Sequence, residues 1–142
     1  MEIRKLTIEN YEEIVRLWRK ANLPFKPNGR DSKDAIAVQM MANPEFFLGV
    51  FEDNRLVGVA VLSSDMRRGW INRLAIDPDY RNRGFAKALI SESERIFRKH
   101  GLGIFCALIE DYNVASKKLF KECGYVEHHD ILYFSKRDSE EV

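Results

Sequence analysis

One stretch of the chain, from Trp70 to Leu89, constrains the fold more than any other because its periodicity changes halfway along. In the first half, apolar side chains alternate with polar or small ones, as in a half-buried strand: Leu74 and Ile76 fall on one side, and Arg73, Ala75 and Asp77 on the other. Pro78 cannot donate to a β-ladder and ends this strand. From Gly84 onward the apolar residues recur at helical spacing, so the stretch predicts a strand, a turn and a long helix.

The loop between this strand and helix is suited to an anion. The first turn of a helix leaves backbone N–H groups without partners, and the helix dipole adds positive potential there. Close approach of an anion favours small residues, which Gly84 and Ala86 supply. Arg81, Arg83 and Lys87 add positive charge around the same point. The loop therefore predicts a pyrophosphate site, although neither a P-loop nor a G-x-G-x-x-G dinucleotide motif is present.

Two motifs resemble those of a known family. Arg81-x-x-Gly84-x-Ala86, after a Leu-Ala-Ile-Asp-Pro strand, resembles motif A of the GNAT family of N-acetyltransferases, whose pattern is Arg/Gln-x-x-Gly-x-Gly/Ala. The segment from Asn113 to Tyr125 resembles the family's Asn-x-x-Ala-x-x-Leu-Tyr-x-x-x-Gly-Phe. The alternative is that Gly84 merely opens a turn in an ordinary α/β domain.

The resemblance implies a binding site for acetyl-CoA. In the family, the main chain of the strand corresponding to Leu74, Ala75 and Ile76 pairs with the pantetheine amides and can polarise the thioester carbonyl. The pyrophosphate is bound by the loop and the first helical turn, here Arg81, Asn82, Arg83, Gly84, Phe85, Ala86 and Lys87. The second motif adds Asn113, Ser116 and Phe120, of which Asn113 can cap its helix and contacts the pantetheine arm in the family.

This chain departs from the second motif at two positions. Ser116 replaces the usual alanine, which is a mild change. Phe120 replaces the tyrosine that protonates the departing thiolate in many members. Because a thiol has a reference pKa near 8.5, losing this proton donor forgoes roughly 2 kcal/mol at pH 7. A defect of that size does not abolish acyl transfer, and water or a neighbouring donor could replace the phenol.

The general base is less well defined by the sequence. Family members commonly carry a carboxylate on the strand that here contains Trp70, Asn72 and Arg73, none of which is acidic. Members that acetylate protein N-termini have a glutamate where this chain has Leu108. Glu110 lies two residues further along and is expected on the same side of that strand, so it is the candidate base, acting through water; the alternative is a solvated residue at a strand end. Asn72 could orient a water or the acceptor.

The acceptor site has three aromatic candidates and one loop. Trp70, Phe25 and Tyr133 could line an acceptor pocket, although core packing would also explain each of them. The loop from Pro24 to Arg30 corresponds to the segment that covers the acceptor in family members, so we expect it to act as a lid.

The resemblance covers the whole chain and implies its fold class. We expect a single N-acetyltransferase domain over residues 1–142, of the α/β (α+β) GNAT fold, with a mixed, mostly antiparallel sheet of six to seven strands, about four helices and a splayed parallel strand pair. The predicted strands are Glu2–Leu6, Phe46–Glu52, Arg55–Leu62, Trp70–Asp77, Gly103–Ile109 and two forming a hairpin within Tyr125–Ser135. The predicted helices are Thr7–Ala21, Ser32–Asn43, Gly84–His100 and Val114–Glu122.

Composition excludes several other classes of protein. Apolar residues make up 45% of the 142 residues and charged residues 32%, which is typical of a globular chain. The formal net charge of +1 gives no reason to expect nucleic acid or a membrane surface as a partner. The three histidines and two cysteines show no metal-ligand spacing. We expect a cytoplasmic monomer or homodimer without a metal.

The sequence therefore predicts an N-acetyltransferase that uses acetyl-CoA as co-substrate. The acceptor would be a primary amine of a small molecule or peptide, which attacks the thioester directly in a ternary complex. An acyl-CoA-binding module without turnover is the alternative, motivated by Phe120 and by the missing carboxylates. A phosphate-binding α/β protein unrelated to CoA is a third possibility.

Overall fold

A computed structural model describes residues 1–142. Five strands form one sheet in the order β1-β2-β3-β4-β5, antiparallel except for the parallel pair β4 and β5. The strands are β1 (Glu2–Lys5), β2 (Phe47–Glu52), β3 (Arg55–Ser64), β4 (Gly69–Ile76) and β5 (Phe105–Ala107). The α-helices are α1 (Tyr11–Lys20), α2 (Lys33–Ala42), α3 (Phe85–Lys99) and α4 (Val114–Glu122). Short 3₁₀ helices at Ile8–Asn10, Pro44–Phe46 and Pro78–Tyr80 precede α1, β2 and α3, respectively. No helix is both long enough and apolar enough to cross a bilayer.

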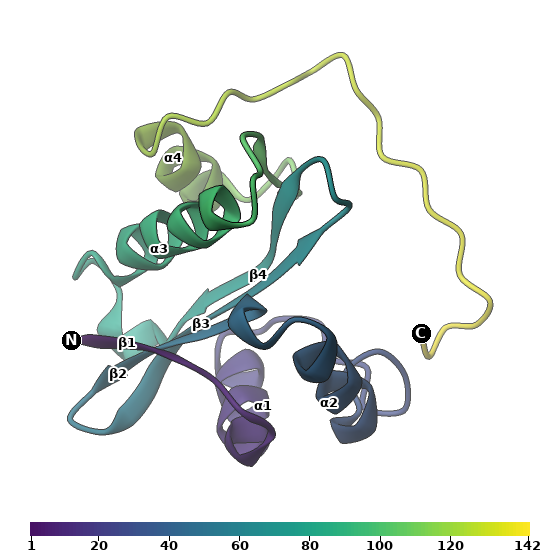
Figure 1. The fold of residues 1–142 in the computed structure, drawn as a ribbon. Helices are drawn as coiled ribbons and strands as arrows, with labels where there is room; N and C mark the ends of the chain where they lie inside the picture. The colour runs from purple at the N-terminus through teal and green to yellow at the C-terminus, as the bar shows by residue number, and fades with distance from the viewer.

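The sheet lies between two helical layers. Helices α1 and α2 cover one face, and α3 covers the other, with α4 beyond it (Figure 1). One hydrophobic core, which includes Trp18 and Phe47, joins the sheet to α1 and α2. The second, which includes Leu89 and Phe97, joins the sheet to α3 and reaches Phe120 of α4. Both sheet faces are therefore buried, as the apolar runs of β2 and β3 require.

A bulge in β4 determines which way its side chains point. Ile71 pairs with Leu62 and Arg73 pairs with Val61, so Asn72 is an extra residue without a partner on β3. Ile71 consequently joins the core under α3, whereas Arg73 lies over the ring of Trp18 on the opposite face. Beyond the bulge, the predicted alternation of β4 is confirmed, because Leu74 and Ile76 pack under α3 and Ala75 packs with α1.

Strand β5, the second strand of the parallel pair, is much shorter than the sequence predicts. We expected it to span Gly103–Ile109, covered on both faces, but β5 comprises only Phe105–Ala107, and each of its residues is half-buried. Ile104 and Leu108, which flank it, are exposed. The physical reason is that β5 pairs with β4 alone and has no second neighbouring strand to continue its ladder. The sheet therefore has five strands, and the predicted number of six to seven is wrong.

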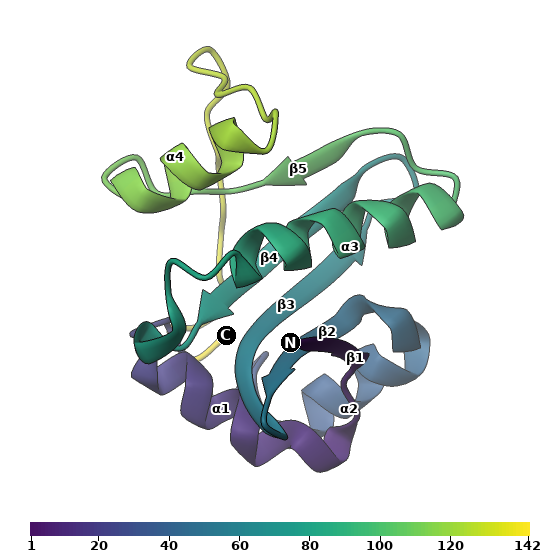
Figure 2. The same ribbon diagram turned by 90° about the vertical axis from the view of Figure 1, so that its left-hand side faces the viewer.

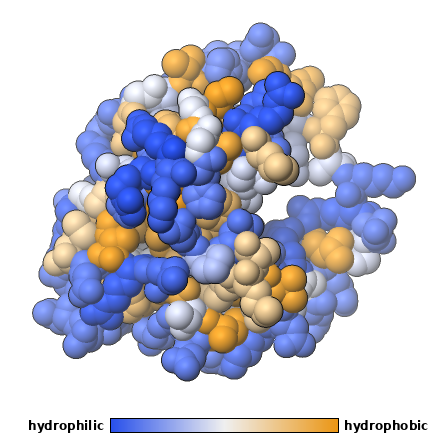
Figure 3. Space-filling model, viewed as in Figure 1, coloured by the Kyte–Doolittle hydropathy of each residue, from blue (hydrophilic) through white to orange (hydrophobic).

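The predicted hairpin within Tyr125–Ser135 is also wrong. Residues 126–142 contain neither helix nor strand, and they arch away from α4 as an extended tail whose end returns to the loop between α1 and α2 (Figure 1). The apolar run from Ile131 to Phe134 is exposed, because it is continuous rather than alternating and no strand lies beside it. Figure 3 shows scattered hydrophobic residues on a mostly hydrophilic surface, with a hollow where the tail passes the body of the molecule.

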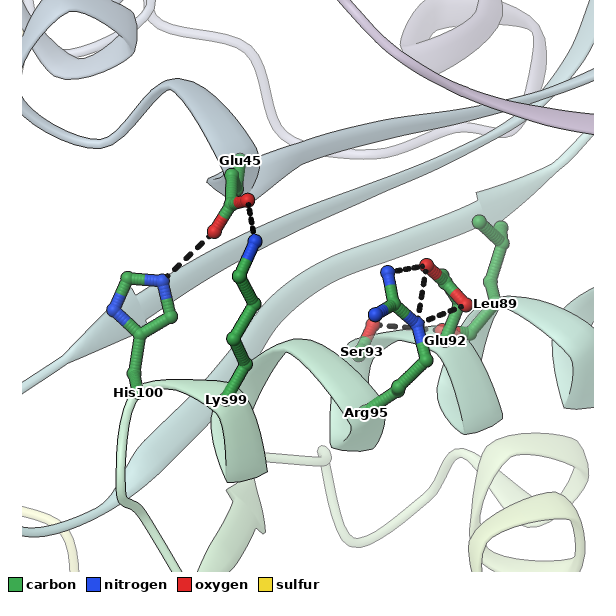
Figure 4. A network of polar contacts seen from close by, with 7 residues as sticks. All are labelled: Glu45, Leu89, Glu92, Ser93, Arg95, Lys99 and His100. Atoms are coloured by element: carbon green, nitrogen blue, oxygen red, sulfur yellow. Dashed lines mark hydrogen bonds and ion pairs between the residues drawn. The ribbon is translucent and has the colours of Figure 1, made fainter.

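The carboxyl end of α3 is tied to the turn that precedes β2. Glu45 accepts a hydrogen bond from Lys99 Nζ at 2.6 Å and lies 2.9 Å from His100 Nε2 (Figure 4). These two contacts lower the pKa of Glu45 to about 2. Gly101 then adopts a φ of +79°, which ends the helix as the sequence predicts. The ion pairs lie on the surface, far from the end of α3 that begins at Phe85.

The close packing of α3 on β4 gives a first prediction. A Cβ atom at Gly69 would lie 2.4 to 2.6 Å from three ring atoms of Phe97, which is fully buried and cannot move aside. We therefore expect Gly69→Ala to lower the free energy of unfolding by about 1–3 kcal/mol, measured by urea denaturation. Gly103→Ala is the matched control, because a Cβ there meets nothing within 4 Å. Equal stability of the two variants would contradict this account of the packing.

Candidate active site

The corner between β4 and α3 is open. After the turn at Pro78–Tyr80, Asn82 and Gly84 both adopt left-handed backbone angles, with φ of 63° and 81°. A Cβ placed on Gly84 would meet no atom within 4 Å, so no side chain fills the space in front of this residue. Glycine is therefore needed here for its backbone conformation, and the open space leaves room for a ligand to approach the main chain.

Free amide groups face this corner. The first hydrogen bond of α3 runs from Ala88 N to Gly84 O at 3.1 Å, and Gly84 has no side chain with which to cap the helix. The amides of Phe85, Ala86 and Lys87 therefore precede the intrahelical ladder and have no cap. A helix terminus of this kind, at the start of a helix that runs from Phe85 to Lys99, is a favourable position for a phosphate group.

The basic side chains near the corner differ in their availability. Arg81 and Arg83 are exposed, and the Arg83 guanidinium lies 5.0 Å from the centroid of the Tyr80 ring. Lys87 instead donates to Glu122 of α4 at 2.9 Å, which raises its pKa. Arg81 and Arg83 can thus contact an anion directly, whereas Lys87 must first exchange its bond to Glu122. Phe85 is buried in the core and can contribute only its main chain.

The main-chain edge of β4 is unpaired next to this corner. Strand β5 pairs with β4 only at Gly69, Trp70 and Ile71, and the two strands then diverge (Figure 2). From Asn72 to Ile76 no strand pairs with β4 on that side. The backbone of Leu74, Ala75 and Ile76 therefore presents polar groups that an extended ligand could pair with as an added strand.

The second motif forms a capped helix with a buried aromatic pair. The Asn113 side chain accepts a hydrogen bond from Ser116 N at 3.1 Å and caps α4. Phe120 is buried and packs edge-to-face against Tyr125, with ring centroids 5.0 Å apart. The Tyr125 hydroxyl donates to Glu94 at 2.8 Å, and burial together with this carboxylate raises the pKa of Tyr125 far above its usual value. Tyr125 therefore keeps its proton engaged with Glu94.

The two candidate catalytic residues lie on different segments, one on β4 and one after β5. Asn72 is the exposed bulge residue of β4, and its amide donates to Ser63 Oγ at 2.7 Å. Glu110 is exposed and lies beyond the end of β5, where its carbonyl accepts from Asn113 N at 2.9 Å. The expectation that Glu110 shares one side of a strand with Leu108 is wrong, because both residues lie outside β5.

The three aromatic candidates for the acceptor pocket are not brought together. Phe25 packs against Trp18, with ring centroids 6.4 Å apart, and Tyr133 is exposed in the tail. Trp70 lies on β4 opposite Ser63 and Cys106. Sequence reasoning missed the role of Asp31, which is buried and bonded to Arg73. In the sequence, Asp31 stands directly before Ser32, which caps α2, and an acidic residue at that position indicates no more than a helix start.

Comparison with known proteins shows the family to which this chain belongs. A family model for the acetyltransferase (GNAT) family matches residues 11–125. An acetyltransferase of Yersinia pestis (strain Pestoides F) is 31% identical over 137 residues, which is 96% of this chain and 95% of the relative. The crystal structure of PaiA N-acetyltransferase from Thermoplasma acidophilum in complex with coenzyme A covers 86% of this chain and 87% of that chain, with a TM-score of 0.75 and 24% identity. The structure of aminoglycoside N-acetyltransferase AAC(6')-Iy in complex with a bisubstrate analogue covers 96% of this chain and 97% of that chain, with a TM-score of 0.78 and 18% identity.

The chain therefore belongs to the GNAT acetyltransferase family. It is an N-acetyltransferase, and acetyl-CoA is its co-substrate. The two structural likenesses establish that the fold is shared. Open space, uncapped amides and two exposed arginines lie together at the corner by Gly84, which is where we expect the diphosphate of this co-substrate to bind.

The open corner gives a second prediction. Gly84→Asp would place a carboxylate beside two phosphates, and we expect it to weaken the binding of acetyl-CoA by at least about tenfold in isothermal titration calorimetry. Gly101→Asp is the matched control, because Gly101 lies at the other end of α3, has a φ of +79°, and also has nothing within 4 Å of a Cβ. Both variants carry the same backbone strain, so equal affinities would show that the diphosphate does not bind at Gly84.

Proposed function

We propose that this enzyme acetylates a primary amine of a small molecule or a peptide by direct attack of the amine on the thioester of acetyl-CoA. The observation that carries the proposal is the free edge of β4 from Asn72 to Ile76, which begins at the point where β5 diverges and leads to the open corner at Gly84. A thioester that extends from a diphosphate at Gly84 along this edge would have its carbonyl beside unpaired backbone amides.

The reaction exchanges one bond for another and moves one proton. The neutral amine nitrogen attacks the carbonyl carbon, a C–N bond forms, and the C–S bond breaks. The amine loses a proton and the sulfur gains one, so the products are an amide and a free thiol. Backbone N–H groups of β4 near Leu74 can stabilise the negative charge that develops on the carbonyl oxygen, because no strand pairs with them.

The demand on a general base depends on the acceptor. A lysine-like amine, with a pKa near 10.4, costs roughly 4–5 kcal/mol to neutralise at pH 7, whereas an α-amino group near 7.8 costs only about 1 kcal/mol. We propose Glu110 as the base, acting through water, and Asn72 as a residue that orients a water or the acceptor. Both side chains are exposed, Asn72 on β4 and Glu110 three residues beyond the end of β5.

The second motif has Phe120 in place of the tyrosine that would assist departure of the thiolate. Phe120 packs against Tyr125, and the Tyr125 hydroxyl donates to Glu94, so we assign protonation of the sulfur to water. Because the chain belongs to a family of acetyltransferases, the alternative of an acyl-CoA-binding module without turnover is not retained. AAC(6')-Iy has been crystallised with a bisubstrate analogue in which CoA is joined to acetylneamine, which supports an amine acceptor for this fold.

Release of free thiol tests the proposed class of acceptor. Purified protein with acetyl-CoA should release thiol faster when a suitable amine is added, tested with spermidine, L-lysine and a short peptide with a free N-terminus. We expect a rate that increases with pH between 7 and 9, because a larger fraction of the amine becomes neutral. Binding of acetyl-CoA with no release of thiol for any of the three amines would contradict the proposed class of acceptor.

The same assay tests the proposed base. We expect Glu110→Gln to lower kcat/KM by about 100-fold or more for a lysine-like amine, and less for an α-amino group, which needs a weaker base. The matched control is Asp111→Asn, which neutralises the neighbouring exposed carboxylate and should leave kcat/KM unchanged. If Glu110→Gln is as active as Asp111→Asn with both amines, Glu110 is not the base.

A further inference from the structure

The loop between α1 and α2 is built around a buried carboxylate. Asp31 is only 3% exposed, and its Oδ2 accepts from the backbone N–H of Lys26 at 2.8 Å and from Arg73 Nη2 at 3.0 Å. Its main chain is held as well, because its carbonyl accepts from the Tyr11 hydroxyl at 2.6 Å and its amide donates to Lys26 O. Asp31 thus closes the loop on itself and ties it to α1 and β4.

The cation of this pair comes from β4, at its bulge. Arg73 follows the bulge residue Asn72, and its guanidinium lies 4.5 Å from the centroid of the Trp18 ring. Its Nη1 is buried and has no acceptor in the protein, so Asp31 is the one carboxylate that compensates its charge at hydrogen-bond distance. Without the bulge, strand alternation would direct this side chain to the α3 face, away from the loop.

The pair connects the loop to the strand at the point where β4 becomes free. Arg73 directly precedes Leu74, and both belong to the stretch that has no partner on the β5 side. The diphosphate corner at Gly84 lies beyond the other end of this stretch, after Ile76. A change in the pair therefore acts on the side of the opening near Asn72 more directly than on the corner.

We propose that the Asp31–Arg73 pair positions the α1–α2 loop, residues 22–32, as one wall of the acceptor site, so that the pair controls acceptor binding and leaves acetyl-CoA binding unchanged. This inference rests on the proposed function. Asp31 and Arg73 are positioning residues and not catalytic ones. A buried ion pair is a poor source of stability compared with apolar packing, because both charges lose their hydration. Its benefit is a fixed geometry, since a carboxylate with two directed donors holds a loop in one place.

The test uses substitutions that remove charge while preserving shape. Asp31→Asn keeps an oxygen acceptor for Lys26 N, and Arg73→Met keeps an apolar stem over Trp18. The double variant measures whether the two positions are coupled. The control is Glu45→Gln, which also converts a paired acid into an amide, but beside the far end of α3.

Three measurements follow for each variant. Hydrogen exchange at the amides of Gly29 and Asp31, both of which donate to Lys26 O, reports on the loop without any need for activity. Calorimetry gives the Kd for acetyl-CoA. Steady-state kinetics, with whichever of spermidine, L-lysine or the peptide the wild-type protein acetylates fastest, gives KM for the amine and kcat.

We expect Asp31→Asn and Arg73→Met each to speed exchange in the loop and to raise KM for the amine about tenfold, with the Kd for acetyl-CoA within about twofold of wild type. The double variant should be no worse than either single one, and Glu45→Gln should match wild type. If the wild-type protein is active but the variants retain its KM for the amine, or lose acetyl-CoA affinity equally, the inference is overturned while the proposed function stands. Silence of the wild-type protein toward every amine would overturn both.

Discussion

The structure depends on the early end of pairing between β4 and β5. Three pairs of residues join the two strands, from Gly69 to Ile71, and β4 then continues without a partner on that side. Backbone groups that are not paired within the protein must be satisfied by water or by a ligand. The bulge at Asn72 coincides with the divergence and adds a local twist to β4 at that point. The open edge of β4 follows from this divergence, and the direction of Arg73 follows from the bulge.

The two ends of the free β4 edge are chemically different. At the Gly84 end, uncapped amides and two exposed arginines favour a diphosphate, and this part of the site is made chiefly of main chain. At the Asn72 end, the neighbouring residue Arg73 forms a buried ion pair with Asp31, so side chains define this end. Main-chain recognition suits a co-substrate shared by a whole family, whereas side chains and a loop can vary with the acceptor. This difference explains why the co-substrate is identified and the acceptor is not.

Sequence reasoning was most reliable where local physics determines the structure. The end of β4 before Pro78 and the start of α3 near Gly84 follow from the preferences of a few neighbouring residues, and the structure has both. It was least reliable at the carboxyl end of the chain. A strand needs a partner, and the run from Ile131 to Phe134 has none, so its apolar character alone did not produce a strand. The same reason shortened β5 to Phe105–Ala107.

The amino-acid sequence by itself determined the basic turn at Gly84 and the membership of a family that uses acetyl-CoA, because both depend on short-range spacing of glycine, alanine and arginine. Only the tertiary structure decided how far β5 follows β4, which residue forms the bulge, and that Asp31 meets Arg73 across 42 positions of sequence. Strand pairing and a buried ion pair join segments that are distant in the chain, and their geometry is set by the packing of the sheet against α1 and α3. No local pattern of residues encodes it.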